Sequence, residues 1–183
     1  QPATAAPAKG FNWKAHEGTT LQVMFNQHTY SDAVIEKLSE FEEKTGIKVE
    51  YSVTPEENYF DKLTTALNSR SGNPDIFMTG AYQVWEYAPA GYIEPLDNYI
   101  NDPAKTDASY KFDDFYPAIV GSLRWDCIAG HKVGQGSQWA LPMGYELNNL
   151  AYNKRVFDEL SLDPPTTTDA LLEAATKLQG FNG

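Results

Sequence analysis

The order of hydrophobic and polar positions in the first 90 residues predicts three strands that alternate with helices. Apolar runs at 21–25 ("LQVMF") and 75–79 ("DIFMT") are typical of buried strands, whereas 47–53 ("IKVEYSV") alternates apolar and polar residues as a half-buried strand does. Apolar residues at helical spacing follow each strand: Val34, Ile35, Leu38 and Phe41, then Phe60, Leu63 and Leu67, then a short segment at 83–88. This alternation predicts an α/β fold with a mainly parallel sheet flanked by helices.

Local signals indicate where two of these helices end and begin. Gly46 stands where a C-terminal cap belongs. Thr54 is followed by Pro55 and, three residues after the threonine, by Glu57, which is the pattern of a capping box. We therefore expect one helix to end at Gly46 and the next to begin with Thr54 as its cap.

Beyond residue 90 the pattern is less regular. Prolines and acids in 94–117 predict loops and short helical turns, and the glycines of 130–136 predict a hairpin or turn. Two short strands are expected next, at 139–143 and 147–152, on either side of a lone carboxylate at Glu146. A helical turn at 154–160 and a threonine-capped helix follow, the latter with an apolar stripe of Leu171, Leu172, Ala175 and Leu178.

Composition limits the classes of protein and partner. With 42% hydrophobic residues, the 183-residue chain can form one sizeable core and hardly two. Its 25 acidic and 14 basic residues give a formal net charge of −11, which argues against nucleic acid and anionic membrane surfaces as partners. No apolar run approaches the roughly 20 residues that span a bilayer. The opening "QPATAAPAKG" is typical of a flexible tether, which we expect to cover residues 1–18.

No set of residues predicts catalysis or a resident cofactor. The segment "GQGSQW" (134–139) lacks the third glycine of a dinucleotide fingerprint and the second glycine of a nucleophile elbow, so a plain turn is favoured. The three histidines are scattered and have no metal-ligand spacing. The single cysteine, Cys127, follows Asp126, whose charge is expected to raise the pKa of the thiol. We expect no catalytic residue, no cofactor and no metal.

Aromatic side chains follow the predicted strands. Tyr30 comes after the first strand, Tyr59 after the second, and Tyr82 and Trp85 after the third. Ligands of parallel α/β sheets bind beyond the carboxyl ends of the strands. Rings there would suit a sugar, because pyranose C–H faces stack on rings while hydroxyls bond to amides and carboxylates. The alternative, which periodicity favours for any single aromatic, is that a ring such as Tyr59 or Trp85 only covers helix–sheet packing.

Five segments together resemble the family 1 extracellular solute-binding proteins, the sugar-binding components of ABC importers that include maltose-binding protein. They are "FEEKTGIKVEY" (41–51), "GNPDIFMTG" (72–80), "AGYIEPLDNYI" (90–100), "WALPMGYELNNLAYNKRVFDEL" (139–160) and "PPTTTDALLEAATKL" (164–178). The resemblance implies a type II periplasmic-binding-protein-like fold, in which hinge strands join two α/β lobes that close around a sugar. It places the first lobe at 19–144, a hinge crossing strand at 145–152 and the incomplete start of the second lobe at 153–183.

The resemblance also implies a set of ligand-binding residues. They lie after the first strand (Asn26, Gln27, His28 and Tyr30), after the second (Glu56), after the third (Thr79, Tyr82 and Trp85) and at the crossing (Tyr145 and Glu146). Glu146 is expected to face the cleft and to accept hydrogen bonds from sugar hydroxyls. Where maltose-binding protein has a tryptophan and an acid–base pair in the third turn, this chain has Thr79, Tyr82 and Gln83, so the resemblance does not carry maltodextrin specificity with it.

The resemblance implies a non-catalytic, extracytoplasmic receptor, periplasmic or at the cell surface and free or lipid-tethered at the N-terminus. Its partners would be a sugar or oligosaccharide and the permease subunits of an ABC transporter. Family members have roughly 400 residues, so the remainder of the second lobe is expected in a missing or separate segment, and residues 1–183 alone should bind ligand weakly or not at all. Three alternatives remain: the same fold binding a polyamine, metal chelate or anion, a glycoside hydrolase that pairs Glu146 with a distant carboxylate, and a scaffold without a ligand.

Overall fold

A computed structural model describes residues 10–181, which fall into two compact units, one ending at Tyr145 and the other beginning at Glu146. In chain order the first unit contains β1 (Thr20–Asn26), α1 (Thr29–Ile35), α2 (Leu38–Thr45), β2 (Lys48–Thr54), α3 (Glu56–Asn68), β3 (Ile76–Phe77), α4 (Ala81–Tyr87), α5 (Asp97–Ile100), the 3-10 helices η1 (Ala108–Tyr110) and η2 (Phe112–Asp114), α6 (Pro117–Ser122), β4 (Arg124–Trp125) and β5 (Ser137–Gln138). The second unit contains α7 (Lys154–Glu159) and α8 (Thr168–Leu178).

The first unit is built on a parallel sheet with the strand order β2-β1-β3. β1 pairs with β2 along its whole length, from Thr20 opposite Lys48 to Asn26 opposite Thr54. On its other side β1 pairs with β3, which is shorter than the predicted strand at 75–79. Because β1 has a neighbour on each side and helices over each face, residues 23–26 are all buried. The predicted parallel α/β sheet is confirmed.

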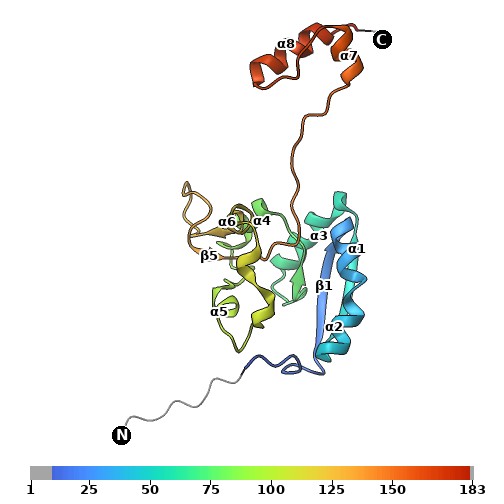
Figure 1. Ribbon diagram of the computed structural model, residues 1–183. Coiled ribbons are helices and arrows are strands. Elements are labelled where there is room, and N and C mark those ends of the chain that lie inside the picture. The colour runs from blue at the N-terminus through green and yellow to red at the C-terminus, as the bar shows by residue number, and fades with distance from the viewer. Residues whose placement is uncertain (1–9, 182–183) are drawn as a thin grey trace. The chain divides into compact units, whose positions relative to one another are not determined.

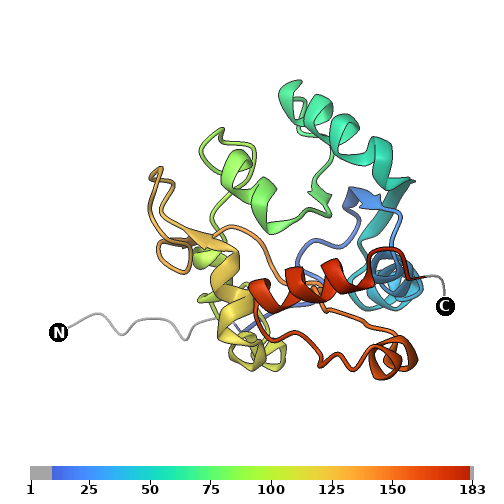
Figure 2. The ribbon, with the colours of Figure 1, turned by 90° about the horizontal axis from the view of Figure 1, so that it is seen from above.

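Helices cover both faces of this sheet, as Figures 1 and 2 show, with α1 and α2 on one side of the strands and α3 on the other. Tyr59 and Leu63 of α3 are fully buried and pack with Met24 of β1 and Tyr87 of α4. The hydroxyl of Tyr59 lies 2.7 Å from the carbonyl oxygen of Met78 and 3.0 Å from that of Met24, and it donates to this pair. Burial raises the pKa of the Tyr59 hydroxyl, so it stays a protonated donor.

Two helix boundaries differ from the prediction. The helix expected from Val34 to Gly46 is divided, because the backbone N–H of Lys37 bonds the carbonyl of Val34 three residues back and this tight turn ends α1. α2 ends at Gly46 with φ 71°, as predicted. The capping box at Thr54 is wrong, because Thr54 is the buried last residue of β2 and its hydroxyl accepts from Lys62 at 3.3 Å. Pro55 takes the cap position of α3 without a side-chain hydrogen bond.

The strands predicted at 139–143 and 147–152 are absent from the structure, and the hinge role of 145–152 stays a prediction. A strand forms only just before this stretch, at β5, which pairs antiparallel with β4. Between 139 and 152 the backbone pairs with no strand among residues 10–181. Alternating apolar residues fit a strand, but a strand forms only where a second backbone supplies hydrogen bonds, and the alternation carries no information about that partner. Gly136, in the predicted turn, has φ 80° and lies so close to Asp126 that a Cβ would sit 2.5 Å from its backbone nitrogen.

The second unit is a pair of helices, and the cap of the second helix agrees with the prediction. Thr167 caps α8 by accepting from the backbone N–H of Ala170 at 3.1 Å, which confirms the threonine cap. Phe157 and Ala174 are buried, whereas Leu172 is 68% exposed, so the predicted stripe is wrong at Leu172. In α8, positions 171, 174, 175 and 178 share a face and line an apolar pocket of about 270 Å³, while 172 points away from it.

The second half of the predicted tether makes contacts at the amino end of the sheet. Phe11 and Trp13 meet edge to face at 5.0 Å, and the ammonium of Lys44 on α2 lies 3.4 Å from the centre of the Trp13 ring. The N–H of Gly18 donates to the carbonyl of Gly46 at 2.9 Å. Residues 1–9 of the predicted tether lie outside the described residues. Between residues 10 and 181, no helix combines the length and apolar character that crossing a membrane requires.

We expect Tyr59→Phe to destabilise the first unit by about 1–3 kcal/mol, because the carbonyl of Met78 would lose its buried donor while the ring packing stays. Urea unfolding followed by circular dichroism measures this loss. Tyr116→Phe is the matched control, since Tyr116 is 72% exposed and its change should stay within about 0.5 kcal/mol. Equal stability of the two variants would contradict the role given to the Tyr59 hydroxyl.

Candidate functional site

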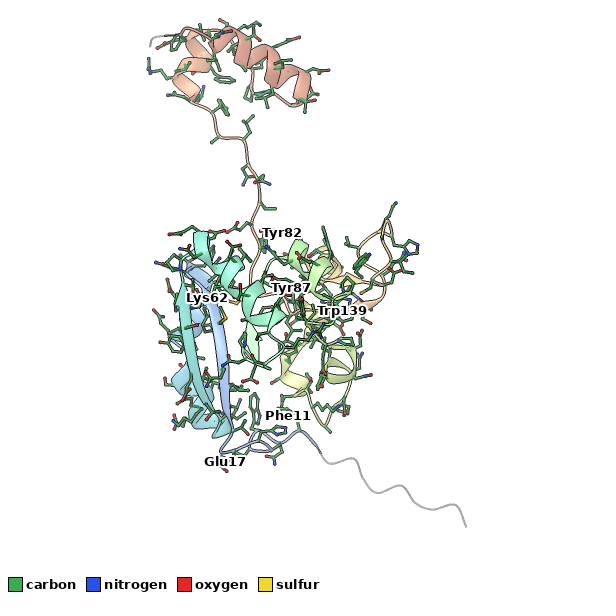
Figure 3. All side chains as sticks on the ribbon, turned by 180° about the vertical axis from the view of Figure 1, so that it is seen from behind. Phe11, Glu17, Lys62, Tyr82, Tyr87 and Trp139 are labelled. Carbon is green, nitrogen blue, oxygen red and sulfur yellow. The ribbon has the colours of Figure 1, made fainter. Side chains whose placement is uncertain are left out.

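The carboxyl ends of the three parallel strands meet at one edge of the first unit. Asn26 and Thr54 are register partners, and the N–H of Gln27 continues the pairing to the carbonyl of Thr54 at 2.9 Å. On the other side the N–H of Met78 donates to the carbonyl of Met24 at 3.0 Å, which brings Thr79 to the same edge. Predicted site residues from three separate turns therefore come together, as parallel topology requires. Figure 3 shows Tyr82 at this end of the unit and Glu17, which precedes β1, at the opposite end.

Two buried polar atoms at this edge lack a hydrogen-bond partner within residues 10–181. They are the side-chain oxygen Oδ1 of Asn26 and the hydroxyl Oγ1 of Thr79. Asn26 is only 6% exposed, so water cannot easily replace the missing partner. An unpaired buried polar group costs about 1–3 kcal/mol, and such groups in native proteins call for an explanation. Two of them on neighbouring strand ends give this edge unused hydrogen-bonding capacity.

The turn between β1 and α1 is held by side-chain hydrogen bonds. His28 caps α1, since its Nδ1 accepts from the N–H of Tyr30 at 3.2 Å. The buried hydroxyl of Ser31 lies 2.6 Å from the carbonyl oxygens of both Asn26 and His28. The rings of His28 and Tyr30 are in contact, with centroids 4.6 Å apart. The predicted residues of this turn are thus fixed relative to β1, with Gln27 exposed to solvent.

α4 presents exposed aromatic side chains beside the same edge. Gly80 caps the helix, and its N–H donates to the side-chain oxygen of Gln83 at 3.1 Å. The ring of Tyr82 lies over Gly80, 3.1 Å from the position that a Cβ would take, and Tyr82 is 64% exposed. Trp85 is 41% exposed. For Tyr59 and Trp85, helix–sheet packing was the alternative to ligand binding. Tyr59 is a fully buried core residue, whereas Trp85 remains partly exposed.

The remaining predicted residues lie at less constrained positions. Glu56 is exposed in the first turn of α3. The hydroxyl of Tyr30 donates to the backbone carbonyl of Tyr145 at 2.8 Å, so these two predicted residues are brought together. The side chain of Tyr145 is 56% exposed. Glu146 is exposed and begins the second unit, and its expected role toward a ligand stays a prediction.

Two residues of this region did not stand out in the sequence. Lys62 extends from α3 to the hydroxyl of Thr54 at the end of β2, a contact that depends on the angle between helix and strand. Gly144 lies against the ring of Tyr30, where a Cβ would come within 2.4 Å of Cε2. A glycine before Tyr145 can be seen in the sequence, but only the fold shows that the ring of Tyr30 occupies the space that a side chain at position 144 would need.

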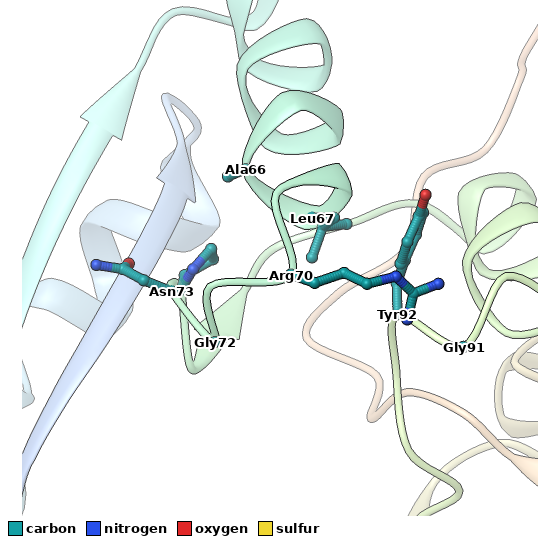
Figure 4. Close-up of a pocket in the computed structure, with 8 residues that line it drawn as sticks. Ala66, Leu67, Arg70, Gly72, Asn73, Gly91 and Tyr92 are labelled. Carbon is teal, nitrogen blue, oxygen red and sulfur yellow. The ribbon is translucent and has the colours of Figure 1, made fainter.

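A pocket of about 240 Å³ lies away from this edge, in front of the amino end of β3 (Figure 4). The guanidinium of Arg70 lies 5.4 Å from the centre of the Tyr92 ring and donates to the carbonyl of Ala90 at 3.0 Å. None of the predicted ligand-binding residues lines this pocket. The Arg70 guanidinium and the Tyr92 hydroxyl, which donates to Asn68, are already engaged, so this pocket is a weaker candidate than the carboxyl edge.

Asp126 interacts with both Cys127 and His131. Burial and, to a smaller degree, the charge of Asp126 raise the pKa of the Cys127 thiol, which confirms the predicted direction. His131 bonds the carboxylate of Asp126 at 2.7 Å, and this contact lowers the pKa of the aspartate. In the described range 10–181, no three His, Cys, Asp or Glu side chains gather in a group that could hold a metal ion.

Comparison with known proteins relates the chain to receptors for small solutes. Residues 16–181 match the family described as bacterial extracellular solute-binding protein. The erythritol/L-threitol-binding protein of Mycolicibacterium smegmatis is 39% identical over 170 residues, which are 92% of this chain and 36% of that protein. The chain thus spans little more than a third of the length of this relative.

Solved structures give the same result for the fold. A solute-binding protein of an ABC transporter from Agrobacterium radiobacter, in complex with ribitol, matches with a TM-score of 0.61 and 25% identity over 88% of this chain and 38% of its own. One from Agrobacterium vitis with bound D-mannitol matches with a TM-score of 0.58 and 23% identity over 87% of this chain and 36% of its own, and it supports the fold alone. The strand–helix order, the parallel sheet and these matches lead to one conclusion: the chain has the α/β type II periplasmic-binding fold and belongs to the bacterial extracellular solute-binding protein family.

Proposed function

We propose that this chain supplies the first lobe of a receptor for a sugar alcohol or a small sugar, which binds at the carboxyl edge of β1, β2 and β3. The observation that carries the proposal is the pair of buried, unpaired oxygens of Asn26 and Thr79 on adjacent strand ends. A ligand with several hydroxyls would satisfy both once the side chains that cover these two atoms move aside, since each hydroxyl donates and accepts. The names of the relatives, which bind erythritol, L-threitol or ribitol, support the same ligand class.

The surrounding side chains suit the rest of such a ligand. The exposed rings of Tyr82 and Trp85 offer flat surfaces for C–H groups. Gln27 and Glu56, both exposed beside the strand ends, add amide and carboxylate groups for further hydroxyls. Glu146, at the start of the second unit, is assigned a further carboxylate contact with a ligand hydroxyl.

The mechanism that fits this arrangement is binding without chemistry. The ligand would bias a pre-existing open–closed equilibrium of two lobes, and the closed form would deliver it to the permease subunits of an ABC transporter. The family description, extracellular, supports a location outside the cytoplasm, either free or tethered by lipid. The roles of Tyr82, Trp85 and Glu146 in this scheme are recognition and orientation.

Titration of the complete protein with erythritol, ribitol, mannitol and small sugars should change its tryptophan fluorescence, because Trp85 lies beside the proposed site. Binding at 100 times the dissociation constant should stabilise the fold by about 2.7 kcal/mol. A thermal shift measured on the same samples checks this independently. Absence of both responses across neutral and acidic sugars and sugar alcohols would contradict the proposal.

Separate substitutions of Tyr82 and Glu146 distinguish a hydroxyl-rich ligand from an inorganic anion. Tyr82→Ala and Glu146→Gln should each weaken sugar-alcohol binding by about tenfold, as truncation of a central contact does. An anion site would keep its affinity, or gain some, when the glutamate is neutralised. Isothermal titration of both variants with the best ligand and with sulfate tells the two classes apart, and unchanged sugar-alcohol affinity in both variants would contradict the assigned contacts.

Thr79→Val should leave stability unchanged or slightly raised, because it removes a buried hydroxyl that has no partner within the described residues. Ligand affinity should fall about tenfold, since the unpaired hydroxyl is kept for the ligand. Thr45→Val is the matched control, because the hydroxyl of Thr45 donates to the carbonyl of Phe41 at 2.7 Å and accepts from Ile47 at 3.1 Å. That control should lose about 1–3 kcal/mol of stability while it keeps its affinity. The opposite pattern would remove the main support for the site.

A further inference from the structure

The first unit holds its own last residues through one aromatic side chain. The hydroxyl of Tyr30 on α1 donates to the carbonyl of Tyr145 at 2.8 Å, a contact between residues 115 positions apart. The division between the two units falls directly after Tyr145. Residues 146–153 form neither helix nor strand, and α7 begins at Lys154. This hydrogen bond is therefore located where the connecting segment leaves the first unit.

Gly144 shows that the backbone lies directly on the Tyr30 ring. A Cβ at position 144 would lie 2.4, 2.5 and 2.8 Å from ring atoms Cε2, Cζ and Cδ2 of Tyr30. Gly144 does not have a positive φ, so its backbone conformation does not require glycine. Glycine is required at this position because the Tyr30 ring approaches so closely. Ring contact and hydrogen bond together fix the backbone at 144–145 in one place.

Tyr30 itself is well positioned for this role. Its backbone N–H is bound by the capping side chain of His28, and the buried Ser31 ties the same turn to the end of β1. The backbone of Tyr30 is thus anchored to the end of β1, and its hydroxyl already donates a hydrogen bond to the backbone carbonyl of Tyr145. Tyr30 was predicted to bind ligand directly, and its observed contacts favour a different task.

We propose that Tyr30 and Gly144 form an exit latch, defined as the Tyr30 ring and hydroxyl on the backbone of residues 144–145, which fixes the point from which the second unit moves. Tyr30 is then a positioning residue and not a ligand contact. The latch restricts the directions in which the segment after Tyr145 leaves the first unit. A latched exit reduces the number of open arrangements from which closure must start, and it should therefore raise ligand affinity. This effect on affinity rests on the proposed function.

The test measures the restriction itself and needs no ligand. In the complete protein with Cys127→Ser, spin labels at Glu43→Cys on α2 and Lys177→Cys on α8, both exposed positions, report the distribution of distances between the two units. Tyr30→Phe keeps the ring and removes the donor, which should lower the occupancy of the latched state about fivefold and broaden the distribution. Gly144→Ala should broaden it as well, because the new methyl group cannot share the space with the ring. Tyr110→Phe on η1 is the control and should leave the distribution unchanged.

A distribution of the same width in Tyr30→Phe and in the parent would overturn the latch, and so would equal broadening in Tyr110→Phe. Circular dichroism verifies that each variant is folded. With erythritol or ribitol as the probe, Tyr30→Phe should lose at most about fivefold in affinity, whereas Tyr82→Ala should lose affinity without any change in width. If the parent binds no sugar or sugar alcohol, the proposed function fails, and the distance distributions still decide the latch.

Discussion

The parallel pairing of β1 with a strand on each side is the constraint on which the rest of the molecule depends. The register pairs Asn26 with Thr54 and Met24 with Phe77, and all three strands run in the same direction, so the turns after β1, β2 and β3 open at one edge. Tyr59 reinforces this alignment from α3, because its buried hydroxyl bonds the carbonyls of Met24 on β1 and of Met78 directly after β3. Any site at this edge inherits its geometry from the backbone of the sheet.

The candidate site differs from the core in how its polar groups are satisfied. Elsewhere in the described residues, the buried hydroxyls of Tyr59 and Thr45 have partners, whereas Oε1 of the buried Gln138 in β5 has none. At the carboxyl edge, Asn26 and Thr79 keep buried oxygens without partners among residues 10–181. Such groups cost stability, which is the usual sign of a position retained for function. The exposed rings of Tyr82 and Trp85 beside them fit the same explanation.

Periodicity predicted the elements that local residues determine and failed where distant ones decide. The strands β1 and β2 and the glycine end of α2 were confirmed, because each follows from neighbouring residues. The expected burial alternation of β2 was wrong, since Tyr51 and Val53 are 48% and 41% exposed. The strands expected at 139–152 were wrong, since no adjacent backbone pairs with that stretch in the described part of the chain. Thr54 was assigned as a cap for the same reason: its local pattern fits, but the sheet continues through it.

The site shows the same division. Parallel pairing brings Asn26, Thr54 and Thr79 to a common edge, whereas the sequence named Asn26 and Thr79 as ligand-binding residues through the family resemblance. No local pattern could show that the hydroxyl of Tyr30 is used on the backbone of Tyr145, or that Gly144 makes room for its ring, since both depend on contacts across more than 110 residues. Family membership, by contrast, followed from five segments in order and was confirmed over residues 16–181.

Hydrogen–deuterium exchange of the complete protein, with and without a bound sugar alcohol, tests the central claim most directly. Ligand should slow exchange at 26–30, 54–57 and 79–85 together, since these turns share the carboxyl edge of the sheet. The pocket at the opposite edge, around Arg70 and Tyr92, should show no change. Protection confined to that pocket, or absent from the three turns while the ligand is bound, would contradict the account.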